Sequence, residues 1–178
     1  MMDSTIDQSL WDNGICMVFG EIDDCTSRQV AEFILHHNLQ SKCDHLQLVI
    51  NSPGGCLVNS WCIVDLINIS TLPVYTLGMG QVSSGALLIL MAGKQGHRYV
   101  SKHCTIMTHQ FMGECEGKVH ELQVVMQNFQ KSHEQMIEFY QQCTLLSREQ
   151  ILEKLLPAHD VYLKPEQALQ MGMVDRIV

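Results

Sequence analysis

Two adjacent serines, Ser83 and Ser84, stand between a glycine-containing segment and a strongly apolar run, within residues 78–86 (GMGQVSSGA). A serine hydroxyl is a weak nucleophile at neutral pH. It needs a neighbouring base, an acid that orients the base, and backbone donors for the developing oxyanion. A serine at the start of a helix lies beside unpaired N–H groups that favour negative charge. Either serine is therefore a candidate nucleophile, although serines at such positions also serve as ordinary N-caps.

A second glycine-containing segment, residues 51–55 (NSPGG), follows another predicted strand. Its consecutive glycines, Gly54 and Gly55, allow the backbone to turn sharply and to present an N–H group to a substrate oxygen. The alternative interpretation is a plain turn. In open parallel sheets, ligands bind beyond the carboxyl ends of the strands. Because both glycine segments follow strands, we expect them at the same edge of one sheet.

The chain has nine histidines that could act as the base. His109 follows a predicted strand at residues 105–108, and Asp160 falls in a predicted loop between two helices. The residues alone leave rivals open for both roles: His97 and His103 for the base, and Asp175 for the acid. Three further histidines, His36, His37 and His45, are expected on the surface.

Apolar runs and helical patterns alternate along the chain, which is typical of an α/β fold with a parallel sheet and right-handed crossovers. Expected strands cover residues 15–19, 46–50, 73–79, 98–100, 105–108 and 173–178. Expected helices cover residues 27–39, 59–69, 83 or 84 to 92, 118–143, 147–155 and 165–171. For the first helix we expect an N-cap at Thr26 or Ser27 and an inward face of Val30, Phe33, Ile34 and Leu39.

The predicted helix at residues 118–143 carries one continuous stripe of mostly apolar residues. The stripe consists of Val119, Leu122, Met126, Phe129, His133, Met136, Tyr140 and Cys143. At 1.5 Å per residue this helix is about 39 Å long, which is more than a domain of this size covers. The pattern favours burial against a partner. The alternative is a core helix packed wholly within the monomer.

Composition limits the class of protein. With 178 residues the chain is long enough for one domain, and 46% hydrophobic residues exclude general disorder. The net charge of −8, without a basic stripe, argues against nucleic-acid binding. The most apolar run, residues 86–92, is too short to cross a bilayer. No signal peptide is visible at the N-terminus, so a cytoplasmic location is expected.

Eight cysteines without a CxxC pair are interpreted as buried free thiols. A metal site from His103, Cys104, His109 and Cys115 is conceivable, but its spacing fits no common zinc pattern. We therefore expect neither a metal nor a cofactor.

Several segments resemble the ClpP family of caseinolytic serine peptidases. They are residues 50–55 (INSPGG), 80–86 (GQVSSGA) with 92–93, 107–110 (MTHQ), 160–163 (DVYL), 166–168 and 172–175 (GMVD). The similarity runs from about residue 14 to the C-terminus. Alignment without a gap places the family's nucleophile on Ser84. The sequence departs from the family at Gly85, where a methionine is usual, and at Phe111, where a proline is usual.

The resemblance implies a mechanism in which Ser84 attacks a peptide carbonyl and His109 transfers the proton to the leaving amine. Asp160 would orient the imidazole, while the N–H groups of Gly55 and Gly85 form the oxyanion hole. It also implies a single domain over residues 1–178, with repeated ββα units of the crotonase-like superfamily. The long helix would be a protruding handle, at about residues 110–143.

The resemblance further implies two seven-membered rings that stack through their handles into a homo-oligomeric tetradecamer around a chamber. Substrates would be peptides or unfolded proteins, delivered by an AAA+ ATPase. Only about 13 residues precede the first predicted strand. The chain is therefore expected to be a short variant without most of the axial-loop segment.

Three functions are compared. The expected one is an ATP-dependent type of serine endopeptidase. The alternative is a weakly catalytic or non-catalytic ClpP-like subunit, viral or accessory, that assembles with or regulates a paralogous peptidase. A crotonase-like enzyme acting on an acyl thioester is disfavoured, because it would not need a Ser-His-Asp set.

Overall fold

A computed structural model describes residues 4–40 and 42–178 of the chain. The described residues divide into two compact units. The first contains the chain up to Met107 together with Leu163–Val178, and the second contains Thr108–Tyr162. The predicted domain begins at Met1, but residues 1–3 lie outside the described residues.

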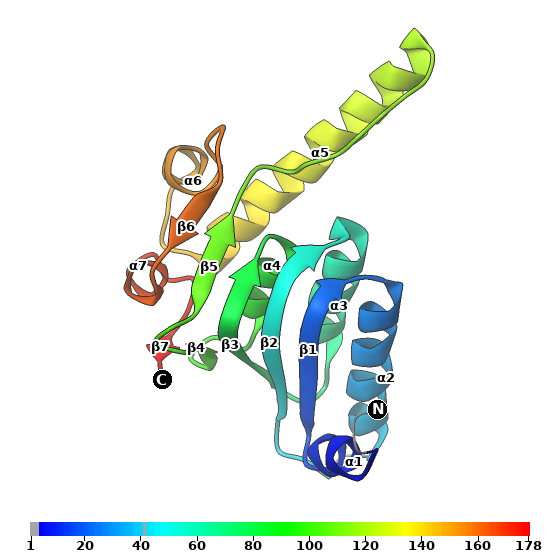
Figure 1. The fold of residues 1–178 in the computed structure, drawn as a ribbon, viewed down its shortest axis with the longest axis vertical. Coiled ribbons are helices and arrows are strands. Elements are labelled where there is room, and N and C mark those ends of the chain that lie inside the picture. The colour runs from blue at the N-terminus through cyan, green and yellow to red at the C-terminus, as the bar shows by residue number, and fades with distance from the viewer. Residues whose placement is uncertain (1–3, 41) are drawn as a thin grey trace. The chain divides into compact units, whose positions relative to one another are not determined.

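The first unit is built on a parallel sheet, whose strands run side by side in Figure 1. Their order is β1-β2-β3-β4-β7, and β5 also pairs in parallel with β3. The bounds are β1 (Ile15–Ile22), β2 (Leu46–Gly55), β3 (Val74–Ser83), β4 (Arg98–Val100), β5 (Thr105–Thr108) and β7 (Arg176–Ile177). The predicted parallel sheet is confirmed, although β7 is shorter than the expected strand at residues 173–178.

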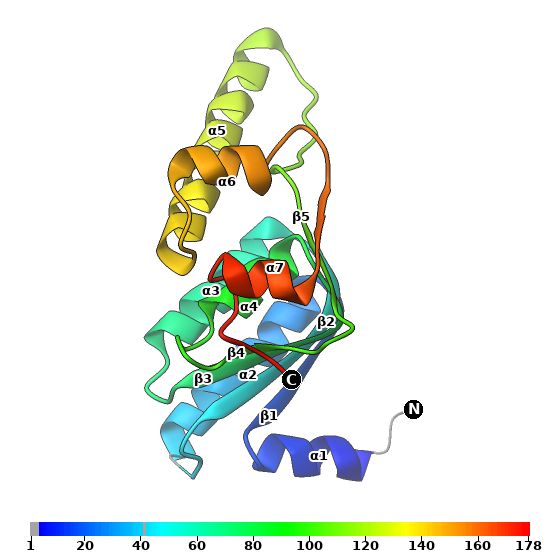
Figure 2. The ribbon, with the colours of Figure 1, turned by 90° about the vertical axis from the view of Figure 1, so that its left-hand side faces the viewer.

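Helices α2, α3 and α4 cover one face of this sheet, as Figure 2 shows from the side. The helices of this unit are α1 (Ser4–Asp12), α2 (Asp24–Gln40), α3 (Leu57–Ile69), α4 (Gly85–Ala92) and α7 (Pro165–Gln170). Helix α4 is apolar all round, and its side chains from Ala86 to Met91 are buried. A helix with apolar residues on every side is stable only inside the core, so α4 forms the centre of this unit.

The start and the inward face of α2 differ from the prediction. The helix begins at Asp24, because the Asp23 carboxylate accepts the Thr26 N–H at 2.8 Å and caps the first turn. Leu39 is 88% exposed, whereas His37 is only 3% exposed. The sequence-based expectation was thus wrong for both residues. The buried face instead follows Val30, Phe33, Ile34 and His37.

The NSPGG segment is part of a strand and not a turn that ends one. After an irregularity beyond Phe19, β1 continues to pair with β2, with Glu21 opposite Gly54 and Ile22 opposite Gly55. The Cys56 N–H then donates to the Ile22 carbonyl at 2.8 Å. Because of this additional pairing, β2 extends to Gly55, and the two glycines are its last residues. Helix α3 then begins at Leu57.

The second unit contains α5 (Val119–Cys143), α6 (Arg148–Lys154) and the first residues of β6 (Val161–Leu163). The C-terminal half of α5 supplies its core, through Met136, Ile137 and Tyr140. The Thr108 and Tyr140 hydroxyls share a buried hydrogen bond of 2.7 Å. Two hydrogen-bonded contacts of 2.8 Å join Arg148 on α6 to Glu134 on α5. The long predicted helix is confirmed, with its start one residue later.

The segment between β5 and α5 lies along that helix (Figure 1). The Phe111 and Phe129 rings meet at 5.1 Å between centroids. A Cβ at Gly113 would come within 2.6 Å of the Phe129 ring, so glycine permits this close approach. Phe129, a member of the predicted stripe, is thus covered from within its own unit.

Candidate active site

Ser84 has a strained backbone at the junction between β3 and α4. Its φ of 54° lies in the left-handed region, and it is the one non-glycine residue with positive φ among residues 4–40 and 42–178. Such a conformation costs about 1–3 kcal/mol and is common at functional sites. Ser84 is the N-cap of α4 without capping through its side chain. Its N–H donates to the Met107 carbonyl at 2.9 Å.

The structure distinguishes the two adjacent serines. Ser83 is fully buried, and its hydroxyl accepts a hydrogen bond of 3.0 Å from the Gln81 side chain. Ser84 is partly exposed. Of the two hydroxyls, the one on Ser84 is therefore better placed to meet a substrate.

The glycines of β2 lie directly beside Ser84. A Cβ built on Gly54 would lie 2.6 Å from the Ser83 carbonyl oxygen and 2.8 Å from Ser84 Cβ. The φ of Gly54 is 93°, which side chains rarely allow. Glycine is required at this position for both reasons. The sequence-based expectation that the two glycine segments share one edge of the sheet is met within the first unit.

Two backbone nitrogens lie close together next to Ser84. The Gly55 nitrogen lies 4.0 Å from the place where a Gly85 Cβ would be, and the Gly85 nitrogen lies 3.0 Å from the place of a Gly54 Cβ. In the parallel ladder, Ile22 is paired with Gly55, and its carbonyl accepts a hydrogen bond from the N–H of the next residue, Cys56. Alternate residues of a strand direct their N–H groups to opposite sides, so the Gly55 N–H is directed away from β1.

Ser60 explains why a glycine follows Ser84. A Cβ on Gly85 would overlap the Ser60 Oγ, which donates to the Cys56 carbonyl at 3.0 Å. The methionine usual at this position in the ClpP family therefore does not fit beside Ser60 without rearrangement. Sequence analysis missed Ser60, because only the packing of α3 against α4 brings it here.

Asn51 ties the ends of β2 and β3 together. Its Oδ1 accepts the Gln81 N–H at 3.1 Å, and Gly80, with φ of 60°, leaves room for that side chain. The Ser52 hydroxyl in turn accepts the Gly54 N–H at 3.0 Å. These bonds hold both glycine segments in place. The sequence signal was an amide residue at a strand end opposite a glycine, which is hard to recognise without the pairing.

The second unit contains the other two predicted site residues. His109 directly follows β5 and is partly exposed, while Asp160 is exposed and directly precedes β6. The Gln110 side chain donates to the Leu156 carbonyl at 2.9 Å. This bond joins the segment that carries His109 to the loop that leads to Asp160.

The rival residues have other partners. Asp175 accepts from the Arg98 guanidinium at 2.7 Å and from the Gly96 N–H at 2.8 Å. Burial opposes ionisation of Asp175, but these hydrogen bonds outweigh it and hold its pKa below the usual value. The His97 ring stacks on Tyr75 at 3.8 Å and its Nδ1 lies 2.9 Å from the Tyr99 hydroxyl. His103 is exposed. Asp175 thus has a structural role between β4 and β7.

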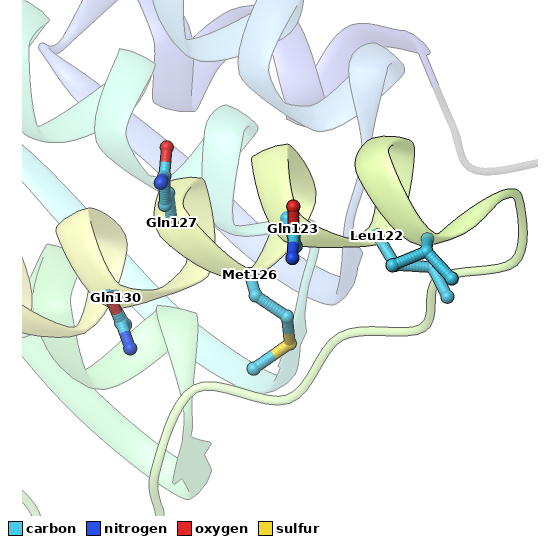
Figure 3. Close-up of a pocket in the computed structure, with 6 residues that line it drawn as sticks. Leu122, Gln123, Met126, Gln127 and Gln130 are labelled. Atoms are coloured by element: carbon cyan, nitrogen blue, oxygen red, sulfur yellow. The ribbon is translucent and has the colours of Figure 1, made fainter.

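The first half of α5 leaves several of its apolar residues exposed, although Phe129 is covered by Phe111. Val119 is 73% exposed, and Met126 is also exposed. A surface groove of about 610 Å³ runs between the side chains of Val119, Leu122, Gln123, Met126, Gln127 and Gln130. The labelled side chains in Figure 3 all come from α5 itself.

Of the eight cysteines only Cys16 and Cys104 are buried, so the prediction of burial is wrong for the other six. In the part of the chain that the structure describes, no three His, Cys, Asp or Glu residues gather as metal ligands would. No helix within those same residues combines the length and apolarity needed to cross a membrane.

A family model described as Clp protease matches residues 2–178. The chain therefore belongs to the Clp protease family, and the fold expected from the resemblance is confirmed. Membership supports a ClpP-like peptidase. Members of this family generally form oligomeric rings and handle peptide substrates.

Proposed function

We propose that this protein is a serine endopeptidase subunit that cleaves peptides or unfolded proteins inside a ring-shaped chamber. The observation that carries the proposal is the conformation of Ser84, a strained, partly exposed N-cap beside two glycine N–H groups. A serine with positive φ, placed between a strand and a buried helix, can present its hydroxyl group to a substrate as a nucleophile. An ordinary N-cap needs no such strain.

In the proposed mechanism, the Ser84 hydroxyl attacks the peptide carbonyl carbon as His109 takes the hydroxyl proton. Asp160 orients the imidazole and stabilises its charged form. The N–H groups of Gly55 and Gly85 stabilise the oxyanion of the tetrahedral intermediate. His109 then gives the proton to the leaving amine, and a water molecule, activated by the same imidazole, releases the acyl group from Ser84.

The test is labelling of the purified protein with a fluorophosphonate, read by intact mass. We expect one adduct that maps to Ser84, is lost in Ser84→Ala and persists in the neighbouring control Ser83→Ala. Hydrolysis of a fluorogenic peptide should fall by at least about 10³-fold in Ser84→Ala. Undiminished hydrolysis in Ser84→Ala would refute the mechanism. Absence of any adduct on assembled protein would favour the alternative of a non-catalytic subunit.

We also propose that residues 110–143 form the handle through which two heptameric rings stack. The exposed apolar residues of the first half of α5, such as Val119 and Met126, support this, because exposed apolar side chains gain free energy by burial against another copy. An AAA+ ATPase or a paralogous peptidase subunit would complete the assembly.

The assembly is tested by light scattering on Met126→Asp. This substitution places a charge in the groove, so we expect particles of about half the mass of the wild type. Asn128→Asp is the matched control, because Asn128 is also exposed but lies on the opposite side of α5. Equal particle masses for Met126→Asp and the wild type would contradict the stacking proposal.

A further inference from the structure

A thiol, an imidazole and a carbonyl oxygen lie in a row at the N-terminal end of the first unit. His37 is buried in the last turn of α2. Its Nε2 lies 2.9 Å from the carbonyl oxygen of Trp11, and its Nδ1 lies 3.8 Å from Cys43 Sγ. Trp11 belongs to α1, and Cys43 lies between α2 and β2. Three separate segments therefore contribute to the cluster.

The bond to Trp11 determines which ring nitrogen carries the proton. A carbonyl oxygen only accepts hydrogen bonds, so His37 Nε2 must be the donor. In a neutral imidazole the other nitrogen then bears a lone pair, and Nδ1 accepts from the Cys43 thiol. This is the arrangement of a nucleophile, a base, and a third group that orients the base.

The surroundings hold the His37 ring in place. The Phe33 ring packs edge-on at 4.8 Å between centroids, and the His36 ring does so at 5.3 Å. Cys43 is only partly exposed, and its Sγ lies 3.1 Å from the place of a Cβ at Gly14. The sulfur thus sits against the bare backbone of Gly14, and a small reagent has better access to it than a protein has.

The other cysteines are matched controls within the same chain. Burial raises the pKa of the Cys16 thiol to about 12 and that of the Cys104 thiol to about 11. These two thiols are poor nucleophiles at neutral pH. Cys25, Cys56, Cys62 and Cys115 are exposed.

We propose that Cys43 is a site of S-thiolation by small disulfides, with His37 as its base. The His37 Nδ1 takes the thiol proton as Cys43 Sγ attacks one sulfur of the disulfide. The new bond joins Cys43 to that sulfur, the original S–S bond breaks, and the other sulfur leaves as a thiolate that accepts the proton. The exchange consumes one disulfide and needs no other oxidant.

The experiment exposes the native protein to limiting glutathione disulfide at neutral pH and follows each cysteine by peptide mass mapping. We expect Cys43 to gain the glutathione adduct faster than the more exposed Cys25. In His37→Gln the amide keeps an N–H donor for the Trp11 carbonyl but removes the base that faces Cys43. Cys43 thiolation should then slow by about tenfold or more, while Cys25 thiolation stays unchanged. His103→Gln, at an exposed histidine outside this cluster, is the control and should leave both rates unchanged.

A second measurement does not depend on whether His37→Gln folds. In urea the protein unfolds and the cluster is lost. The thiolation rate of Cys43 in the wild type should then no longer exceed that of Cys25. The proposal is overturned if Cys43 reacts no faster than Cys25 in the native protein, or if its lead survives in urea. An unchanged Cys43 rate in a folded His37→Gln protein would also overturn it.

Discussion

Helices α4 and α5 are both rich in apolar residues but bury them differently. On α4 the side chains from Ala86 to Met91 are all buried, whereas the first half of α5 leaves Val119, Val124 and Met126 exposed. Helix α4 has apolar residues on every side and therefore forms the centre of a core. The apolar residues of α5 are covered within its own unit mainly from Met136 onward. The comparison indicates that a run of apolar residues predicts burial in general. Only the tertiary packing shows which of these side chains are covered within their own unit.

The largest expected effect is on α4. Leu88→Ala should lower the free energy of unfolding by about 2–5 kcal/mol, because Leu88 is buried and its removal leaves a cavity. Denaturation by urea measures the change. A loss below about 1 kcal/mol would mean that α4 is not as tightly packed as the comparison requires.

A smaller effect is expected at the buried end of α5. Tyr140→Phe leaves the buried Thr108 hydroxyl without its partner, which should cost about 1–3 kcal/mol. Val124→Ala, on the exposed half, is the control for this measurement. Equal losses in both variants would contradict the division of α5 into a buried half and an exposed half.

The raised pKa of Tyr140 predicts that the folded protein loses stability at alkaline pH. Burial raises its pKa to about 12, although the Thr108 hydrogen bond works in the opposite direction. A raised pKa means that the folded state holds the proton more tightly, so this contribution is complete below pH 10 and is lost as pH rises towards 12. Unfolding measured across this range should show a weaker decline in Tyr140→Phe. An identical decline would assign the effect to other groups, such as Cys16.

The lowered pKa of Asp175 predicts that the folded protein loses stability in acid. Its lowered pKa means that the folded state favours the carboxylate, so its contribution is present above pH 3.8 and is lost as pH falls below that value. Asp175→Asn should therefore destabilise the protein at pH 7 and have less effect in stronger acid. Urea titrations at the two pH values compare them. A loss that is independent of pH would indicate altered packing instead of a lost charge.

The smallest effect is expected at Val124, which is 66% exposed. Val124→Ala should change the free energy of unfolding of the isolated chain by less than about 0.5 kcal/mol. The measurement is a urea titration at concentrations where light scattering shows no assembly. A larger loss would show that this half of α5 is covered within the monomer.

Much of the site's framework followed from local sequence. The glycines at 54 and 55 predicted a backbone that can approach a ligand closely, and the apolar run after Ser84 predicted a helix, because these properties depend on neighbouring residues. The sharp turn expected at these glycines is instead the end of strand β2. The choice of Ser84 over Ser83 came from the family resemblance. The burial of Ser83 and its bond to Gln81 then provided a physical reason for it.

Other features depend on residues far apart in the chain. The continuation of β2 through Gly55 requires pairing with Glu21 and Ile22. The absence of a side chain at Gly85, the residue after Ser84, leaves room for Ser60 on α3. His37 was expected on the surface, but α1 covers it and supplies the Trp11 carbonyl. The sequence by itself determined the alternation of strands and helices and limited the candidate nucleophile to two adjacent serines, because these features depend on spacing along the chain. Only the tertiary structure decided which polar groups meet, because hydrogen-bond partners are selected by packing between distant segments.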